Sequence, residues 1–124
     1  NCYATNYSEI FNDALPYFQY QKKKKCKFPV ERLFLKFLSK NHDSHILRKF
    51  GFSRAQEIRY IASKYFKKTQ KHFYPNEQHD LNLLDKYLKR KYVNPGTCAD
   101  LTVTTLLIDK IMDIVKYSNY DIYT

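Results

Sequence analysis

Hydrophobic residues recur at helical spacing along most of the chain. Val30, Leu33, Phe34, Phe37 and Leu38 stand at positions i, i+3, i+4, i+7 and i+8, which is one face of an amphipathic helix. Three later stretches repeat the pattern, with apolar positions at Ile58, Ile61, Ala62, Tyr65 and Phe66, then Leu81, Leu84 and Leu88, then Ala99, Val103, Leu106, Leu107, Ile111, Ile114 and Val115. The pattern predicts helices over residues 53–66, 76–91 and 98–116, each with these side chains turned toward the core.

Another helix is expected near the start of the chain, over residues 9–20, with Ser8 as its cap. Its inward positions are Ile10, Ala14 or Leu15, and Phe18. Pro16 argues against a regular helix interior at that point. No stretch alternates apolar and polar residues as a half-buried strand does. We therefore predict an all-α fold, a bundle of about five helices without a sheet, in a single helical domain over residues 1–124.

Capping residues mark where several of these helices begin and end. Gly51 is expected to stop one helix, and Ser53 with Gln56 forms a capping box for the next. Asn76 can cap the helix that follows. The tyrosine-rich tail after Ser118 is expected to fray.

The last helix follows a proline–glycine turn. Pro95 presets φ for the turn, and Gly96 can take a position with φ above zero. Thr97 is then a natural N-cap, and Asp100 completes a capping box three residues later. One interpretation is a well-capped core helix. The other is that this helix N-terminus, with its N–H groups and positive dipole end, holds phosphate.

The net charge of the chain indicates which kinds of molecule it can bind. Lys and Arg outnumber Asp and Glu by 22 to 12, a formal net charge of +10, and such a surface attracts polyanions. Cys2, Cys26 and Cys98 are an odd number without metal-ligand spacing, which favours reduced thiols and a cytoplasmic location. No apolar run reaches the ~18 residues of a membrane span, and we expect no signal peptide. Because the chain starts with Asn1 rather than Met, we expect a fragment or a trimmed chain.

The segment from His42 to Lys49 concentrates polar groups that a plain bundle does not need. His42 and His45 stand at i and i+3, but no further Cys or His at zinc-like spacing accompanies them, which disfavours a structural zinc site. Asp43 can be the N-cap of a short helix over residues 44–49. Alternatively, a carboxylate beside two cations suits a group that orients magnesium or a hydroxyl near phosphate.

Taken together, the two polar segments resemble the triphosphoribosyl-dephospho-CoA synthase family. Members carry an Asp-Thr-Asn-like motif followed by Arg, and later an Asn/Ser-Pro-Gly-x-x-Ala-Asp-Leu motif that opens an apolar helix. The second motif matches position by position from Asn94 to Leu101. The first departs from the pattern, because Ser44 replaces Thr, His45 replaces Asn, and Phe50 precedes Gly51 where two glycines are usual. The resemblance covers residues from about 29 to 117.

The resemblance implies an all-helical transferase that moves a triphosphoribosyl group from ATP to dephospho-CoA and releases adenine. The product is the prosthetic-group precursor of citrate lyase or malonate decarboxylase. Since family chains are roughly twice as long, it also implies that this chain is the C-terminal half of the family fold. ATP and dephospho-CoA are the expected partners, with Mg²⁺ as the cofactor that neutralises the triphosphate.

The matched positions give the expected site. Asp43 and Asp100 are the candidate catalytic carboxylates and also the candidate magnesium ligands. The candidate substrate-binding residues are His45, Arg48, Asn94, Gly96 and Thr97. The resemblance fixes these positions, and the individual roles are inferred from the chemistry, which needs a carboxylate near the reacting hydroxyl and donors around phosphate.

Two other classes of function remain open. A basic helical nucleic-acid binder explains the net charge and the alternation of lysines with aromatics near Tyr65 and Phe73. It leaves the turn at Pro95 and Gly96 without a purpose, and we favour nucleotide over nucleic acid. A non-catalytic subunit or remnant of a split synthase explains both the motif and the short length, and it implies a complementary chain or a homo-oligomer.

Overall fold

We analysed a computed structural model, which describes residues 8–71 and 73–123, with side chains through residue 116. A π-helical segment, η1 (Ile10–Ala14), leads directly into α2 (Leu15–Lys23). The remaining elements are α3 (Pro29–Lys40), α4 (Ser44–Phe50), α5 (Phe52–Thr69), α6 (Glu77–Arg90) and α7 (Gly96–Tyr123). No strand occurs in the part of the chain described, which confirms the all-α prediction. None of the described helices is both long and apolar enough to cross a membrane.

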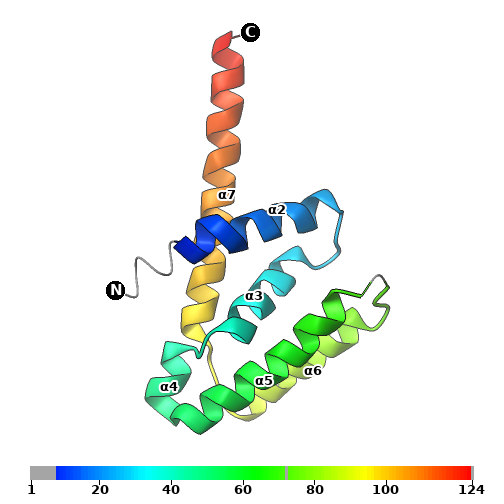
Figure 1. Cartoon of the computed structure of the whole chain (residues 1–124), viewed down its shortest axis with the longest axis vertical. Helices are drawn as coiled ribbons and strands as arrows, with labels where there is room; N and C mark the ends of the chain where they lie inside the picture. The colour runs from blue at the N-terminus through cyan, green and yellow to red at the C-terminus, as the bar shows by residue number, and fades with distance from the viewer. Residues whose placement is uncertain (1–7, 72, 124) are drawn as a thin grey trace.

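The helices are arranged around α3, and α7 extends well beyond the others. In Figure 1, α2 crosses α7 near its middle, while α4 and α5 lie below. The upper half of α7 projects away from the body and carries the C-terminus at its tip. The helix reaches Tyr123, and fraying of the tail after Ser118 stays a prediction.

The core is built mainly on α3. Leu33, Leu35, Phe37 and Leu38 of this helix are at most 1% exposed. The other buried apolar side chains belong to the same cluster: Ile10, Ala14, Phe18, Ile46, Ala55, Ile58, Ala62, Leu84, Leu88, Val93 and Cys98. The inward faces predicted for α2 and α5 are confirmed, but Val30, at the start of α3, is exposed.

Pro16 explains the π-helical segment. A proline lacks the backbone N–H, and its ring clashes with the carbonyl four residues earlier. The chain widens by one residue just before Pro16, so that the N–H of Leu15 bonds to the carbonyl of Ile10. The irregularity predicted at Pro16 is therefore confirmed. The helix already includes Ser8, so Ser8 is not the cap.

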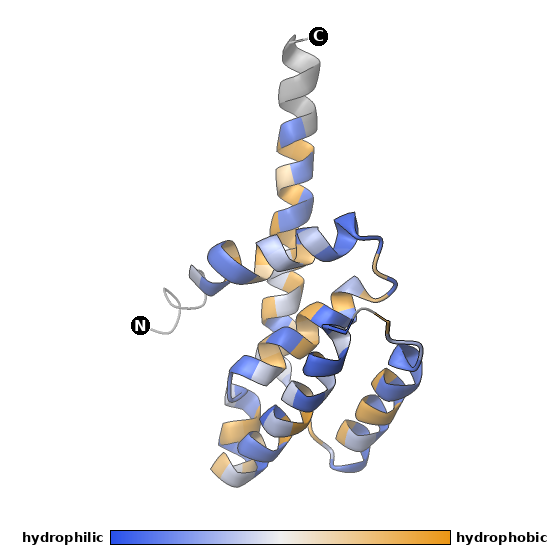
Figure 2. Cartoon of the chain, turned by 45° about the vertical axis from the view of Figure 1, so that its right-hand side comes forward, coloured by the Kyte–Doolittle hydropathy of each residue, from blue (hydrophilic) through white to orange (hydrophobic). Residues whose placement is uncertain are grey.

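The most deeply buried residues of α7 are not the ones that its apolar pattern predicts. The residues turned toward the body are Cys98, Thr102, Thr105 and Asp109, all of them at most 5% exposed. Val103, Leu107, Ile111, Ile114 and Val115 are between 49% and 62% exposed. Figure 2 shows hydrophobic positions continuing along the projecting part of α7. Of the residues predicted to face the core, Leu106 packs against it and Ala99 is partly buried, but the prediction was wrong for Val103, Leu107, Ile111, Ile114 and Val115.

Polar groups satisfy one another on the inner side of α7. The hydroxyls of Thr102 and Thr105 donate to the carbonyls of Cys98 and Leu101, both at 2.8 Å. Asp109 pairs with Lys22 of α2 and accepts a bond of 3.3 Å from Gln19. A buried hydroxyl or carboxylate is tolerated when it is bonded in this way, which explains how a polar face can serve as the packed one.

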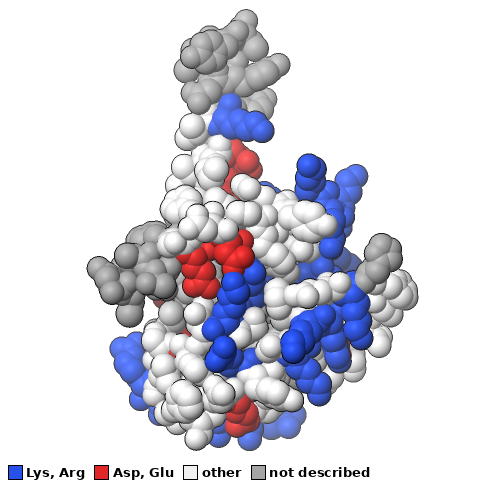
Figure 3. Space-filling model, in the orientation of Figure 1, with Lys and Arg blue, Asp and Glu red and all other residues white. Residues whose placement is uncertain are grey.

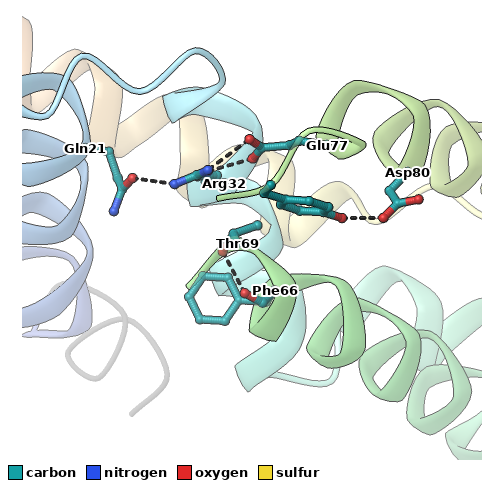
Figure 4. Close-up of polar contacts among 7 residues, drawn as sticks. Gln21, Arg32, Phe66, Thr69, Glu77 and Asp80 are labelled. Carbon is teal, nitrogen blue, oxygen red and sulfur yellow. Dashed lines mark hydrogen bonds and ion pairs between the residues drawn. The ribbon is translucent and has the colours of Figure 1, made fainter. Parts of the chain in front are cut away.

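A buried ion pair joins α2, α3 and α6. Arg32 donates two bonds to the carboxylate of Glu77, at 2.6 and 2.9 Å, and a third to Gln21 at 2.9 Å. Figure 4 shows the guanidinium lying between these two partners. The bond to Glu77 raises the pKa of Arg32, so the guanidinium stays charged although its side chain is nearly buried. The forked geometry fixes the position of α6 relative to α3.

Two helices end in Schellman motifs without glycine. After α6, the N–H of Val93 bonds to the carbonyl of Leu88 and that of Tyr92 bonds to Lys89, with Tyr92 at φ 56°. After α2, Lys25 takes the same place at φ 59°. These are the left-handed positions that usually select glycine. Tyr92 lies two residues before Asn94, so the strain borders the candidate site.

Candidate functional site at the junction of α4 and α7

Asp43 joins the N-termini of α4 and α7. Its Oδ1 accepts the N–H groups of His45 at 2.9 Å and Ile46 at 3.3 Å, which is a regular N-cap of α4. Its Oδ2 accepts the N–H of Cys98, in the first turn of α7, at 2.8 Å. The side chain is 1% exposed. The predicted cap of a short helix is therefore confirmed, and the same carboxylate also caps a second helix more than fifty residues away.

Gly96 is needed for close approach and not for its backbone angle. A Cβ added at Gly96 would lie 3.1 Å from three ring atoms of His45. Among the described glycines, only Gly51 has a positive φ, so the predicted left-handed turn at Gly96 was wrong. The chain reverses at Tyr92 instead, and glycine at 96 lets the His45 ring rest on the start of α7.

Thr97 lies inside α7 and does not cap it. The helix begins at Gly96, and the Thr97 hydroxyl bonds to that of Ser44. The predicted capping box of Thr97 and Asp100 was therefore wrong, since Asp43 supplies the capping carboxylate. The Ser44–Thr97 contact adds a second link between the two polar segments.

The other predicted site residues lie at the surface of this junction. Asp100 stands one turn after Gly96 and Thr97, so the three share a side of α7, and Asp100 is exposed. His45, Arg48 and Asn94 are exposed as well. The contacts of Asp43, Ser44 and His45 bring the start of α4 against the start of α7, with Asp43 buried between the two helices. The buried Asp43 carboxylate already meets the positive ends of both helices, so a ligand on this face would be held by the exposed side chains.

His42 turns away from this face. Its Nε2 lies 2.6 Å from Oε1 of Gln56, and its ring packs against that of Phe52 with centroids 4.9 Å apart. Gly51, at φ 89°, ends α4, which confirms the predicted helix stop. It is also the residue directly before α5. No side-chain bond caps α5, so the capping box of Ser53 and Gln56 was wrong, because Gln56 is bonded to His42.

The thiol of Cys98 is held neutral under the junction. Burial raises its pKa, and the nearby Asp43 carboxylate raises it further. A thiolate is the reactive form of cysteine, so Cys98 is suited to packing rather than nucleophilic catalysis. Cys26 and Cys98 are both unpaired thiols, while Cys2 lies outside the described residues.

The described residues do not fit a magnesium ion held by Asp43. Both of its oxygens accept backbone N–H groups, and the carboxylate is buried. No cluster of three or more His, Cys, Asp or Glu suited to a metal occurs among the described side chains. Magnesium often reaches a protein through substrate phosphates and one carboxylate, and Asp100 is the accessible one. The assignment of Asp43 and Asp100 as metal ligands stays a prediction.

A cavity of about 430 Å³ lies between α3, α6 and α7, which the sequence did not indicate. Phe34, Leu84, Thr102 and Leu106 are among the residues that line it, and Glu31 and Asp85 are also on its wall. At 3.6 residues per turn, Ala99, Thr102 and Leu106 fall on a different side of α7 from Gly96 and Asp100. Only the packing of three helices creates this cavity, so no local pattern could have revealed it.

A family model described as CitG: ATP:dephospho-CoA triphosphoribosyl transferase matches residues 1–119. The match takes in nearly the whole chain, so the expectation that the likeness is confined to a C-terminal half, from about residue 29, was too narrow. No curated protein and no solved structure matches the chain. With both polar segments meeting at one surface and the family match spanning them, the chain belongs to the CitG family of ATP:dephospho-CoA triphosphoribosyl transferases.

Proposed function

We propose that the face formed by α4 and α7 binds the triphosphate of ATP and takes part in transfer of its triphosphoribosyl group to dephospho-CoA. The observation that carries the proposal is the double cap at Asp43. This one carboxylate holds the segment with His45 and Arg48 against the segment with Gly96 and Thr97. These are the two segments whose residue types suit phosphate and a reacting hydroxyl.

The exposed side chains of the junction are of the types that bind a triphosphate. Arg48 is an exposed guanidinium on α4, and guanidinium groups bind phosphate oxygens in a forked arrangement. Asn94 adds an amide and Thr97 a hydroxyl. His45 rests against Gly96, where its ring can contact the ribose or the base.

Two carboxylates receive different roles under the proposal. Asp100 is exposed beside Gly96, where it can accept the proton of the attacking hydroxyl of dephospho-CoA as the bond from oxygen to the anomeric carbon forms. The bond between that carbon and adenine breaks, and adenine leaves with the bonding electrons and takes up a proton. Asp43 is buried and bonded to three N–H groups, so we assign it as a positioning residue. Direct catalysis by Asp43 stays a prediction.

Adenine release is the direct test. The full chain, ATP with magnesium and dephospho-CoA are incubated, and free adenine is measured by chromatography. We expect Asp100→Asn to lower the rate at least tenfold with the melting temperature unchanged. Asp85→Asn, on α6 and paired with Lys89 at the surface, is the matched control. No adenine from the unaltered chain, or equal losses in the two variants, would overturn the proposal.

Binding can be measured separately from the reaction. ATP with magnesium is expected to raise the melting temperature, since a ligand at a hundredfold excess over its dissociation constant contributes about 2.7 kcal/mol. Binding without adenine release would support a non-catalytic nucleotide-binding role, as in a subunit of a split synthase. Absence of both would contradict the nucleotide site altogether.

Nucleic-acid binding is a second candidate because of one surface feature. Figure 3 shows Lys and Arg gathered on the right of the molecule, at the ends of α2 and α5. The exposed lysines of this patch are Lys22, Lys23, Lys24, Lys25, Lys64, Lys67 and Lys71. Duplex DNA binding with a steep dependence on salt, and no effect of ATP, would favour this function over the transferase.

A further inference from the structure

The outer face of α7 is apolar and uncovered. Val103, Leu107, Ile111, Ile114 and Val115, which we call the α7 stripe, are each about half exposed or more. On the side packed against the body, the buried residues are Cys98, Thr102, Thr105 and Asp109, and Leu101, Leu106 and Ile108 are partly buried there. Helices of a monomer turn their apolar face inward, and monomers rarely expose contiguous apolar patches of more than a few hundred Å². An apolar stripe of this length on an exposed helix face calls for a covering partner.

We infer that the α7 stripe is an interface with a second copy of this chain, in which the two α7 helices pack antiparallel. The apolar positions of the stripe are arranged symmetrically along the helix on either side of residue 109. Val103 and Val115 are equally far from this centre, as are Leu107 and Ile111. An antiparallel partner therefore places valine opposite valine and leucine opposite isoleucine, so apolar residues meet along about three turns. This inference is independent of the proposed function.

Charge also favours a second copy. Residues 96–116 contain three Asp and two Lys, although the whole chain carries +10. Two near-neutral helices can approach closely, and antiparallel pairing holds the strongly basic bodies at opposite ends, where their repulsion is weakest. A helix that lies on an anionic membrane would instead carry Lys and Arg along the edges of its apolar face. Asp113 beside Lys110 does not fit that pattern.

The stripe continues the candidate site along the helix. Gly96, Asp100, Val103, Leu107 and Ile111 follow one another at intervals of four, three, four and four residues, which keeps them on one side of α7. A second copy seated on the stripe thus extends toward Asp100. Its projecting helix would reduce the access of water to that carboxylate.

Sedimentation equilibrium of the full chain tests the interface. Over a range of about 1 to 100 μM, typical of such interfaces, we expect the mass to rise from the 15.0 kDa of one chain to twice that value. Leu107→Lys with Ile111→Lys should raise the dissociation constant at least tenfold, with helicity by circular dichroism unchanged. The control is Tyr60→Lys with Phe73→Lys, which alters two exposed aromatics elsewhere and should leave association unchanged.

Spin-label distances test the antiparallel arrangement. With Cys2 and Cys26 changed to serine, Lys110→Cys and Lys116→Cys are labelled separately. The two copies of residue 110 lie nearly abreast, whereas those of residue 116 are separated by roughly 20 Å along the helix axis. Equal distances at both positions would mean a parallel pair and overturn the arrangement. A monomer at all concentrations, including one that binds anionic vesicles through α7, or a dimer unaffected by the two lysines, would overturn the interface.

Discussion

The carboxylate of Asp43 accepts the backbone N–H of Cys98 at 2.8 Å, although the residues are 55 apart in the chain. With its second oxygen the same side chain caps its own helix. Each helix N-terminus otherwise leaves N–H groups without partners inside the helix. One buried charge therefore satisfies two helix ends and holds together the two segments that form the candidate site.

Replacing Asp43 by asparagine should destabilise the protein. The amide keeps one acceptor but presents an N–H₂ group either to α4 or to Cys98, so one buried N–H loses its partner. Such a loss costs about 1–3 kcal/mol of unfolding free energy, measured by urea denaturation. Asp85→Asn should change it by less than about 0.5 kcal/mol.

The rate at which the Cys98 thiol is alkylated reports whether Asp43→Asn opens the junction between α4 and α7. The thiol is fully buried and its pKa is raised, so it should react more slowly than Cys26, which is partly exposed. Asp43→Asn should accelerate modification of Cys98 without affecting Cys26. If the two thiols responded alike, the change would be global unfolding and not an opening of the junction.

Gly96→Ala tests the contact with His45. The new methyl group would lie 3.1 Å from the ring, so His45 has to move, whereas alanine alone favours a helix. We expect the substitution to cost about 1 kcal/mol in the native background and to become neutral or stabilising when His45 is alanine. The coupling in this double-mutant cycle should reach at least about 0.5 kcal/mol. Equal effects in both backgrounds would mean that the ring does not restrict residue 96.

Tyr92→Gly should stabilise the chain. Tyr92 holds a left-handed φ of 56° while its side chain is 83% exposed, so glycine removes strain and little packing. We expect a gain of about 0.5–1 kcal/mol in thermal unfolding, given the usual cost of this conformation and the greater entropy of glycine in the unfolded chain. The same substitution at Tyr60, exposed inside α5, should instead cost about 1 kcal/mol. A loss at both positions would contradict the strain.

Asp13 should contribute to acid sensitivity. Burial raises the pKa of Asp13, but bonds from Lys40 and Lys36 outweigh it, and the pKa is lowered below 3.8. Because the folded-state pKa lies below the unfolded value, this stabilisation is complete above about pH 4 and is lost as pH falls through the folded-state pKa. The pair is partly exposed, so the effect should stay under about 1 kcal/mol.

Unfolding measured between about pH 5 and pH 2 checks this expectation. Asp13→Asn should be less stable than the unaltered chain near neutral pH and should lose less stability on acidification. Parallel curves for the two proteins would show that Asp13 has no linked titration.

The helices themselves follow from sequence alone. The periodicity of α3 and α5, the stop at Gly51 and the irregularity before Pro16 each reflect interactions within one or two turns, which residues close in sequence determine. Asp43 is recognisable as a cap for the same reason, since its N–H partners His45 and Ile46 are local. The motif from Asn94 to Leu101 likewise indicates the family, because its residues are contiguous in the chain.

Only the tertiary structure decided which side of a helix is covered and which distant groups meet. The sequence of α7 has apolar residues on one face, and periodicity assigned that face to the core, yet Thr105 and Asp109 are buried while Leu107 is exposed. Periodicity identifies the apolar face of a helix, but it carries no information about where its partner lies. The bond from Cys98 to Asp43, the His45 ring on Gly96 and the cavity beside Leu84 likewise depend on contacts between helices, and these form only when the whole chain is packed.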